Sequence, residues 1–194
     1  METKLFPCLV DMRFKGVRVD VEKAEKIKQR LIEEEKKLLF KIKELTNIDV
    51  ELWAAASIAK AFDALNLPYD KTEKTGAPSF TRNFLANHPH ELAQSTATAR
   101  EINKAHTTFI DTITKHTHKG RIHADINQIR SDQGGTVTGR FSMSNLNLQQ
   151  IPVRHKELGP LIRSIFIPEE NCKWGVFDYS QQEPRILVHY AKLQ

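Results

Sequence analysis

Residues 20–45 read DVEKAEKIKQRLIEEEKKLLFKIKEL, and this stretch decides the first half of the fold. Apolar side chains recur along it at steps of three and four residues, with Glu and Lys between them: Ala24, Ile27, Leu31, Leu38, Ile42 and Leu45. This spacing predicts an amphipathic helix of about 25 residues, roughly 38 Å long at about 1.5 Å per residue. Asp20 is a suitable N-cap, because its carboxylate can accept a hydrogen bond from the first turn.

A second helix of the same period is predicted over residues 91–114. Its apolar stripe contains Leu92, Ala99, Ile102, His106, Phe109 and Ile113. Between the two long helices we expect a small helix around Ile58, Phe62 and Leu65, then a turn at residues 75–78, after which Ser79 should cap a further short helix. Two long helices joined by a compact tip are expected to pack antiparallel, each burying its stripe against the other.

The chain changes character near residues 119–120, where Gly, Pro, Asn and β-branched residues become more frequent. Ile122, Ala124 and Ile126 alternate with polar neighbours, which is typical of a strand with one buried face. Short strands are predicted over residues 121–129, 137–141 and 174–177, a polar loop over 142–150, and a helix over 183–190. The fold class is therefore α+β, with the helices first and the sheet second.

The composition narrows the class of protein further. In 194 residues, 29 Lys and Arg against 24 Asp and Glu give a formal charge of +5, which favours a polyanionic partner, nucleic acid before a membrane. No apolar run approaches the roughly 20 residues of a membrane span, and residues 1–7 lack the apolar core of a signal peptide. Cys8 and Cys172 are far apart and indicate neither a disulfide framework nor a zinc site. We expect a cytoplasmic globular protein.

Three polar clusters stand out after residue 137: TGRFS at 138–142, NLQQIPVR at 147–154 and DYSQQEPR at 178–185. With KTEKTGAPS at 71–79, they resemble, in this order, the thumb and palm of family A DNA polymerases, the group of bacterial DNA polymerase I and its phage relatives. The resemblance implies a long antiparallel helical thumb over residues 1–119, with a short N-terminal lead-in. It implies the N-terminal part of an incomplete antiparallel β palm over residues 120–194.

The resemblance also implies a reaction, the extension of a primer 3′ end with deoxynucleoside triphosphates by two-metal phosphoryl transfer. Asp178 would be a catalytic carboxylate that binds Mg²⁺, and the main-chain carbonyl of Tyr179 a further metal ligand. Oxygen ligands of this kind suit Mg²⁺. Spacing alone favours the other interpretation, in which Asp178 is the N-cap of the helix that follows it, and only the full motif favours the metal ligand.

The same motif implies three nucleotide-binding residues. Ser180, Gln181 and Glu183 would contact the incoming nucleotide, with Glu183 under its sugar, where it disfavours a 2′-hydroxyl. The alternative for Glu183 is a first-turn acid that interacts favourably with the helix dipole.

A donor-rich set is implied to bind the duplex: Arg140, Asn147, Gln149, Gln150 and Arg154. Minor-groove base edges present acceptors in every base pair, so Arg, Asn and Gln donors can test duplex geometry without reading sequence. A solvated loop is the alternative for this set. Lys71 and Lys74, which flank the thumb tip, are either phosphate contacts or ordinary surface lysines.

Several parts of a complete polymerase are not recognisable in the sequence. No Arg-x₃-Lys fingers helix and no His-Asp-Glu motif follow residue 185. Residues 20–22 and 49–51 match the Asp-x-Glu motif of proofreading exonucleases, but both matches fall at predicted helix starts rather than on a strand. The spacing of His116, His118 and His123 matches no common zinc site. We therefore expect no catalysis by this chain alone. Three interpretations remain open. The chain could be completed by a second polypeptide that carries the fingers and His-Asp-Glu. It could instead be a non-catalytic, sequence-independent duplex-binding module, or a truncated product without function.

Overall fold

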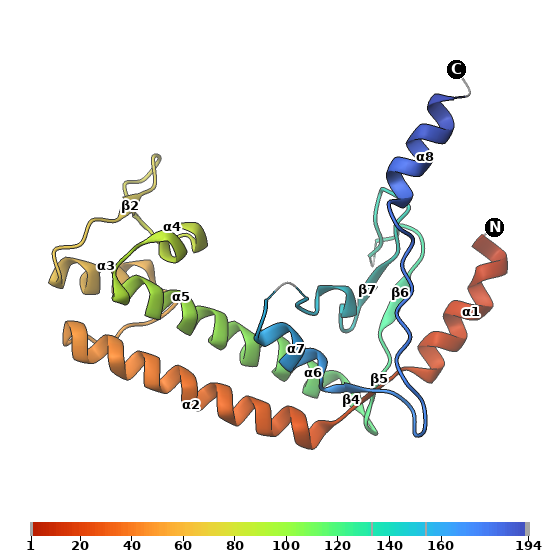
Figure 1. Cartoon of the computed structure of the whole chain (residues 1–194), viewed down its shortest axis with the longest axis horizontal. Helices are drawn as coiled ribbons and strands as arrows, with labels where there is room; N and C mark the ends of the chain where they lie inside the picture. The colour runs from red at the N-terminus through yellow and green to blue at the C-terminus, as the bar shows by residue number, and fades with distance from the viewer. Residues whose placement is uncertain (1, 133, 154, 193–194) are drawn as a thin grey trace.

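A computed structural model of the chain describes residues 2–132, 134–153 and 155–192 (Figure 1). Its α-helices are α1 (Glu2–Lys15), α2 (Val21–Thr46), α3 (Ala55–Ala64), α4 (Arg82–Asn87), α5 (Glu91–Lys104), α6 (Asp111–His116), α7 (Leu158–Arg163) and α8 (Gln182–Ala191). A π-helix, η1 (Ala105–Ile110), joins α5 to α6, and η2 (Leu148–Gln150) is a 3₁₀ turn. The strands are β1 (Val17–Val19), β2 (Asp70–Lys71), β3 (Pro78–Ser79), β4 (Thr117–His118), β5 (Arg121–Ile122), β6 (Asp125–Asn127), β7 (Ser142–Ser144) and β8 (Phe166–Ile167). The α+β prediction is confirmed.

The first long helix, α2, begins and ends where its sequence predicts. The carboxylate of Asp20 accepts a hydrogen bond from the Lys23 backbone N–H at 2.9 Å, and the helix ends at Asn47 in the left-handed region. The buried side chains of α2 are Ala24, Ile27, Leu31, Ile42 and Thr46, so the predicted stripe is the buried face. Burial of this stripe, rather than intrinsic propensity, supplies most of the stability of such a helix.

The second long helix consists of α5, η1 and α6 in one continuous run, and it packs antiparallel to α2. Polar pairs along the contact show the direction, since their residue numbers rise on α2 as they fall on the partner: Lys28–Asp111 at 2.7 Å, Glu35–His106 at 2.5 Å and Lys41–Glu91 at 2.5 Å. The buried His106 and its partner Glu35 meet at the π-helical segment, which periodicity alone did not predict. We refer to the paired helices as the rod.

The tip of the rod is a small domain of α3, the β2–β3 hairpin and α4 around the fully buried Phe62. Its ring lies near those of Tyr69, Phe80 and Phe84, with centroids 4.9 to 6.2 Å apart. The prediction that Ser79 caps a helix is wrong. Ser79 pairs with Asp70 in the hairpin, so the helix begins later, and the Thr81 hydroxyl accepts the capping hydrogen bond from Phe84 N–H at 3.2 Å.

Strands β4, β5 and β8 form a four-stranded antiparallel sheet with β1 of the lead-in, in the order β4-β5-β1-β8. The lead-in strand β1 lies inside it, with Val17 opposite Ile122 and Arg18 opposite Ile167. A core that includes Leu31, Ile110, Ile122 and Ile162 joins the rod to this sheet. A separate β6–β7 hairpin follows, and α1 lies beside it through the Arg13–Asp125 ion pair at 2.6 Å.

Two predicted strands are not formed. Residues 137–141 are a turn, in which Gly139 has a φ of 73° and the Thr136 hydroxyl donates to the Arg140 carbonyl at 2.7 Å, so strand β7 begins only at Ser142. Residues 174–177 are without strand structure because none of the described strands pairs with them, and Phe177 is 96% exposed. The helix predicted over 183–190 is confirmed as α8.

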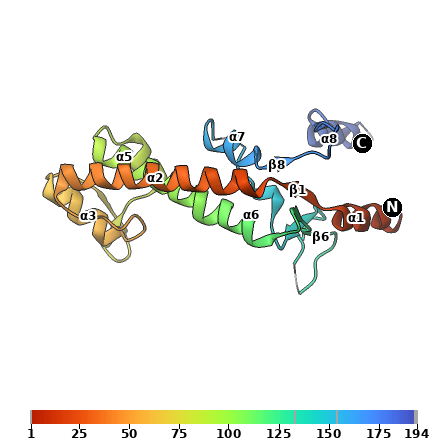
Figure 2. The same ribbon diagram turned by 90° about the horizontal axis from the view of Figure 1, so that it is seen from below.

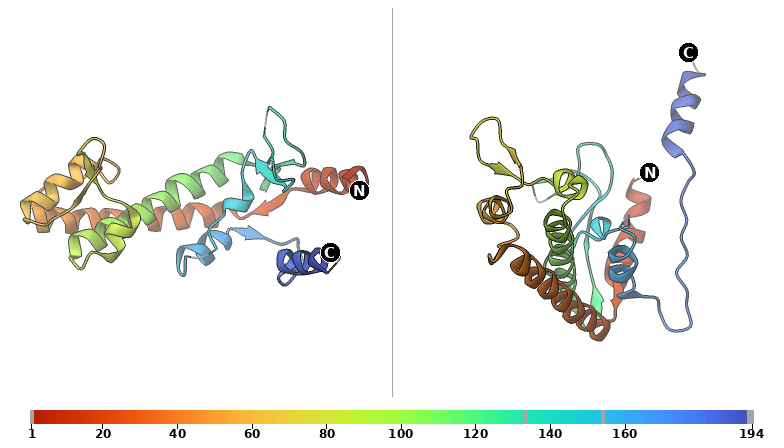
Figure 3. Two further views of the ribbon diagram at one scale, coloured as in Figure 1. Left: turned by 90° about the horizontal axis from the view of Figure 1, so that it is seen from above. Right: turned by 60° about the vertical axis from the view of Figure 1, so that its left-hand side comes forward.

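The molecule is long, with the tip at one end of the rod and both α1 and α8 projecting at the other (Figures 2 and 3). Residues 168–181 run as an irregular connection from β8 to α8 (Figure 1). None of the helices in the described ranges is both long and apolar enough to cross a membrane.

Candidate nucleic-acid interface and carboxylate site

Asp178 lies in the exposed connection between β8 and α8. It borders a surface hollow of about 410 Å³, which is also lined by Tyr179, Ser180, Gln182, Arg185 and Ile186. Asp178 does not cap α8, since the N-cap position belongs to Gln181, whose φ of 52° is left-handed. Across the described ranges, no three His, Cys, Asp or Glu side chains are grouped to hold a metal ion. The Asp178 carboxylate is thus exposed to solvent and does not cap the helix that follows it.

The candidate nucleotide contacts lie next to Asp178 along the chain. Ser180 and Gln181 are exposed, and Glu183 stands in the first turn of α8, so a favourable interaction with the helix dipole is compatible with its position. Its carboxylate also forms an ion pair with the guanidinium of Arg140, and the two side chains are 77% and 73% exposed. The structure therefore brings a candidate DNA contact and a candidate nucleotide contact together.

The loop of residues 147–153, here called the groove loop, is shaped by its own polar side chains. The Asn147 side-chain oxygen accepts a hydrogen bond from Gln149 N–H at 3.1 Å and starts η2, while Gln149 Nε2 donates to the Phe141 carbonyl at 3.3 Å. Gln150 is exposed and faces a cleft. Arg154, the remaining predicted contact of this set, lies outside the described residues.

Lys71 and Lys74 are exposed on the β2–β3 hairpin, and this hairpin lies at the tip, at the far end of the rod from the β6–β7 hairpin (Figure 1). The turn between β2 and β3 is held by its threonines, since the Thr72 and Thr75 hydroxyls are 2.6 Å apart and Thr72 Oγ1 accepts from Ala77 N–H at 3.1 Å. This hairpin presents the two lysines to solvent on a short, internally bonded turn.

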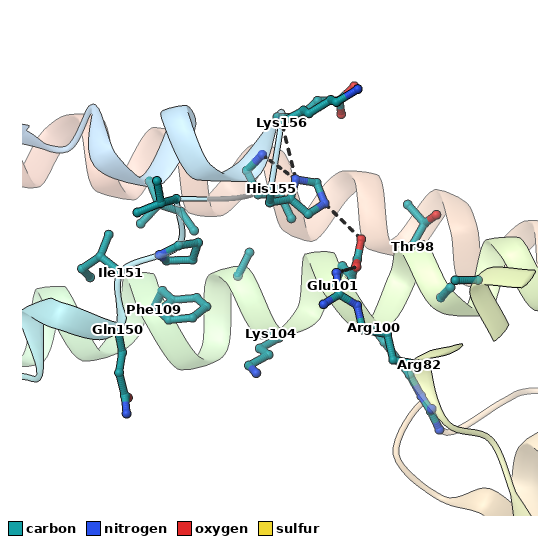
Figure 4. Close-up of a pocket in the computed structure, with 18 of the residues that line it drawn as sticks. Arg82, Thr98, Arg100, Glu101, Lys104, Phe109, Gln150, Ile151, His155 and Lys156 are labelled. Atoms are coloured by element: carbon teal, nitrogen blue, oxygen red, sulfur yellow. Dashed lines mark hydrogen bonds and ion pairs between the residues drawn. The ribbon is translucent and has the colours of Figure 1, made fainter. Parts of the chain in front are cut away.

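A cleft of about 1100 Å³ separates the rod and tip from the groove loop (Figure 4). Its apolar lining includes Leu85, Ala105, Phe109, Ile151 and Pro152. Lys104 from the rod and Gln150 from the groove loop extend to the same side of this cleft in Figure 4. The cleft has both the apolar floor and the convergent polar groups that are typical of a binding site.

Sequence reasoning missed the cations of this cleft, which are Arg82, Arg100, Lys104 and Lys156. Arg100 and Lys104 are four residues apart on α5 and so share one helix face, a spacing that could have revealed them. Arg82 and Lys156 join them only through tertiary packing, and no local pattern predicts that.

Arg100 also fixes the tip to the rod. Its Nε and one terminal nitrogen donate to the carbonyls of Leu52 and Phe80, both at 2.7 Å, and its guanidinium lies 5.4 Å from the ring centroid of Trp53. Burial lowers the pKa of Arg100 from its ordinary value, yet an arginine remains charged at neutral pH. The orientation of the tip thus depends on a partly buried cation beside the cleft.

Comparison with known proteins places these features in a family. The sequence model of DNA polymerase family A matches residues 21–194. The chain belongs to DNA polymerase family A, as its thumb, groove-loop and DYSQQEPR motifs imply.

Individual relatives agree with this assignment. The chain is 34% identical to a DNA-directed DNA polymerase of Pseudomonas phage M6 over 100% of this chain and 30% of that protein. It is 35% identical to the thermostable DNA polymerase I of Thermus aquaticus over 98% of this chain and 23% of that protein. Among solved structures, the POL domain of Pol1 from M. smegmatis, in complex with DNA primer-template and dNTP, matches with a TM-score of 0.78 and 26% identity, over 99% of this chain and 34% of that chain. The chain spans about a third or less of the length of these relatives.

Proposed function

We propose that this chain is the thumb and the start of the palm of a DNA-directed DNA polymerase, and that it holds primer–template duplex. The cleft between the rod and the groove loop carries this proposal, because four cations and the donor Gln150 line it. Phosphate contacts from Arg and Lys supply most sequence-independent affinity for duplex. The solved relative whose fold this chain shares is described in complex with primer-template and dNTP, which supports the same ligands here.

Within this proposal, residues 1–119 form the thumb with its lead-in and residues 120–194 the N-terminal part of the palm. Arg140, Asn147, Gln149, Gln150 and Arg154 contact the duplex near the primer end, and Lys71 and Lys74 contact its backbone at the tip. Lys104 and Arg82 add to this surface, because they line the same cleft as Gln150. Ser180, Gln181 and Glu183 contact the incoming nucleotide.

The residues around Asp178 fit a Mg²⁺ site in part. Asp178 offers a carboxylate in a solvent-facing hollow, and Tyr179 and Ser180 beside it expose further oxygen atoms. Magnesium prefers six oxygen ligands, and it keeps several waters when a protein supplies only one or two carboxylates. Asp178 and the Tyr179 carbonyl would therefore hold the ion, which would stabilise the charge that develops on the transferred phosphoryl group. The reaction itself needs a second carboxylate.

We further propose that catalysis requires the fingers and the His-Asp-Glu motif of a second polypeptide or of a longer chain. The exposed apolar side chains at the end of the molecule opposite the tip support this. Those on α1 include Phe6, Val10 and Phe14, and those on the C-terminal side include Val176, Phe177 and Leu187. Large exposed apolar side chains gathered at one end of a molecule usually mark a contact with another part of the protein or another chain.

Duplex binding is tested by the fluorescence anisotropy of a labelled primer–template titrated with the chain at about 50 and 200 mM salt. If about six phosphates are contacted, affinity should fall by about three orders of magnitude across this range, and duplexes of unrelated sequence should bind alike. Binding that does not respond to salt, or no binding at about 50 mM, contradicts the proposal. The second candidate function is a non-catalytic, sequence-independent duplex-binding module, which the same cleft also favours. The two candidate functions differ in one result: a fragment that carries the fingers should produce primer extension with a polymerase part but not with a binding module.

A further inference from the structure

One carboxylate spans the cleft between two elements that carry candidate DNA contacts. Glu101, on α5, accepts a hydrogen bond at its Oε1 atom from Arg82 of α4 at 2.9 Å. Its Oε2 atom lies 3.0 Å from Nε2 of His155, immediately after the groove loop (Figure 4). The tip helix and the segment that follows the groove loop are therefore tied to the same side chain of the rod.

The second partner, His155, is held in a defined tautomer. Its Nδ1 atom lies 3.0 Å from the backbone N–H donor of Leu158 and 3.3 Å from that of Glu157, so it acts as the acceptor that starts α7. Because Nδ1 accepts, Nε2 carries the ring proton and donates it to Glu101. His155 thus joins the N-terminus of α7 to the rod through one imidazole.

This geometry sets where the groove loop lies. On the core side, Ile151 is 8% exposed and packs with Ile162 of α7, while at its far end the loop is followed by His155. Gln150, which immediately precedes the Ile151 anchor, lines the cleft and extends to the same side of it as Lys104 (Figure 4). Loss of the Glu101 contact would release one of the two anchors and leave the other in place.

We propose that Glu101 is a positioning residue, which holds the groove loop and the tip helix at a fixed separation and so pre-organises the cleft for duplex. The proposal rests on the proposed function for its ligand, but its structural part concerns the free chain. A negative side chain in a cleft for a polyanion costs binding energy by repulsion, so its presence there is explained by the two contacts that it makes. Pre-organisation lowers the cost of ordering groups when a ligand binds.

The structural part is tested by hydrogen–deuterium exchange on the full chain without DNA. In Glu101→Gln, amides of residues 147–158 should exchange several-fold faster than in the parent chain, while amides of α2 keep their protection. Glu34→Gln is the matched control, because Glu34 pairs with an exposed arginine, Arg30, at 2.8 Å and is exposed to a similar degree, 37% against 35%. Equal exchange in the two variants at residues 147–158 overturns the proposal.

His155→Asn separates capping from positioning. Asparagine can still accept a hydrogen bond at the start of α7, but it is too short to reach Glu101. This variant should therefore reproduce the faster exchange of residues 147–153 while α7 stays protected, and adding it to Glu101→Gln should bring no further change, as expected for partners in one contact. Parent-like exchange at residues 147–153, or additive effects, overturns the proposal.

Duplex affinity supplies the functional readout. Both glutamate variants gain the same charge, so the difference between them removes the general electrostatic effect. Glu101→Gln should bind primer–template about two- to tenfold more weakly than Glu34→Gln, the scale of one lost hydrogen bond. Equal or tighter binding overturns the positioning role in binding. If the parent chain binds no duplex, the proposed function fails by itself, and the exchange comparison still decides the structural part.

Discussion

The guanidinium of Arg140 is paired with the carboxylate of Glu183, although 43 positions separate the two residues in the chain. The pair joins the TGR motif to the first turn of α8, and both side chains remain largely exposed. An exposed pair contributes little to stability. The pair instead restricts the positions of both side chains in the free protein, before DNA or nucleotide binds.

Replacement of Arg140 should weaken duplex binding. Arg140→Ala removes a donor from the proposed duplex surface, and we expect primer–template affinity to fall by about three- to tenfold at low salt, measured by anisotropy. Lys36→Ala, which removes a positive charge from an exposed position of α2, is the control and should bind within about twofold of the parent chain. A loss of affinity for Lys36→Ala beyond this twofold limit, as large as that for Arg140→Ala, would show that binding is governed by net charge alone.

The isolated chain should not extend primers. Phosphoryl transfer by two metal ions needs more than the single carboxylate of Asp178, so we expect no product with Mg²⁺ and the four deoxynucleoside triphosphates. Co-expression with a fragment that carries the fingers and His-Asp-Glu, from the same genome where one exists, should give a co-purifying complex that extends primers. Asp178→Ala should abolish that extension and leave co-purification intact. Extension by the single chain, lost on Asp178→Ala, would refute this prediction.

The tip should depend on Phe62. Phe62→Ala removes a fully buried ring, and we expect it to lower the free energy of unfolding by about 3–5 kcal/mol, as measured by urea denaturation. Phe177→Ala is the matched control, because the same deletion at a side chain that is 96% exposed should change stability by less than about 0.5 kcal/mol. A comparable loss in both variants would mean that Phe177 is buried in solution.

Acid should destabilise the contacts of the sheet region. A hydrogen bond from Asn145, and then one from Arg13, lower the pKa of Asp125 below its ordinary value, and a hydrogen bond from Arg121 lowers that of Glu169. A carboxylate whose pKa is lower in the folded state stabilises the fold above the unfolded pKa, and this contribution is lost as pH falls through the folded pKa. The free energy of unfolding should therefore decline as pH falls below about 4.5.

Asp125→Asn and Glu169→Gln test this assignment. Each variant should be less stable than the parent chain near pH 7, and the difference should shrink on acidification, because the parent loses the same interaction when its carboxyl group is protonated. The measurement is urea denaturation between about pH 3 and pH 7. A difference that stays constant over this range would show that the two carboxylates do not carry the acid sensitivity.

Much of the first half of the fold was predictable because periodicity records burial directly. Ile27 and Leu31 lie on the buried face of α2, as their spacing requires, and Asp20 caps it. The sequence-based predictions were wrong where a cap or a strand depends on pairing with another segment of the chain. Ser79 and Thr81 are both acceptable caps, and only the pairing of Ser79 with Asp70 decides between them. Likewise, residues 174–177 have strand composition, but strands need neighbours.

The candidate site was predictable only in its motifs. The clusters around Arg140 and Asp178 are contiguous in sequence, so they could be recognised, whereas the cleft is built from residues brought together by the rod. Arg82 and Lys156 are 74 positions apart, and Glu101 looks like an ordinary helix acid until its two partners are seen. Nor does periodicity predict the π-helical turn at His106.

The connection from β8 to α8 has a consequence for how this protein will behave during purification. Residues 171–181 are exposed, without strand pairing, and proteases cut such segments because they bind their substrates in an extended form. A single cut between residues 171 and 178 would detach Asp178 from the folded body while the core of rod and sheet stayed intact. Loss of a small C-terminal peptide on a gel would then accompany loss of the carboxylate proposed to bind Mg²⁺, with no change in the unfolding transition of the rest.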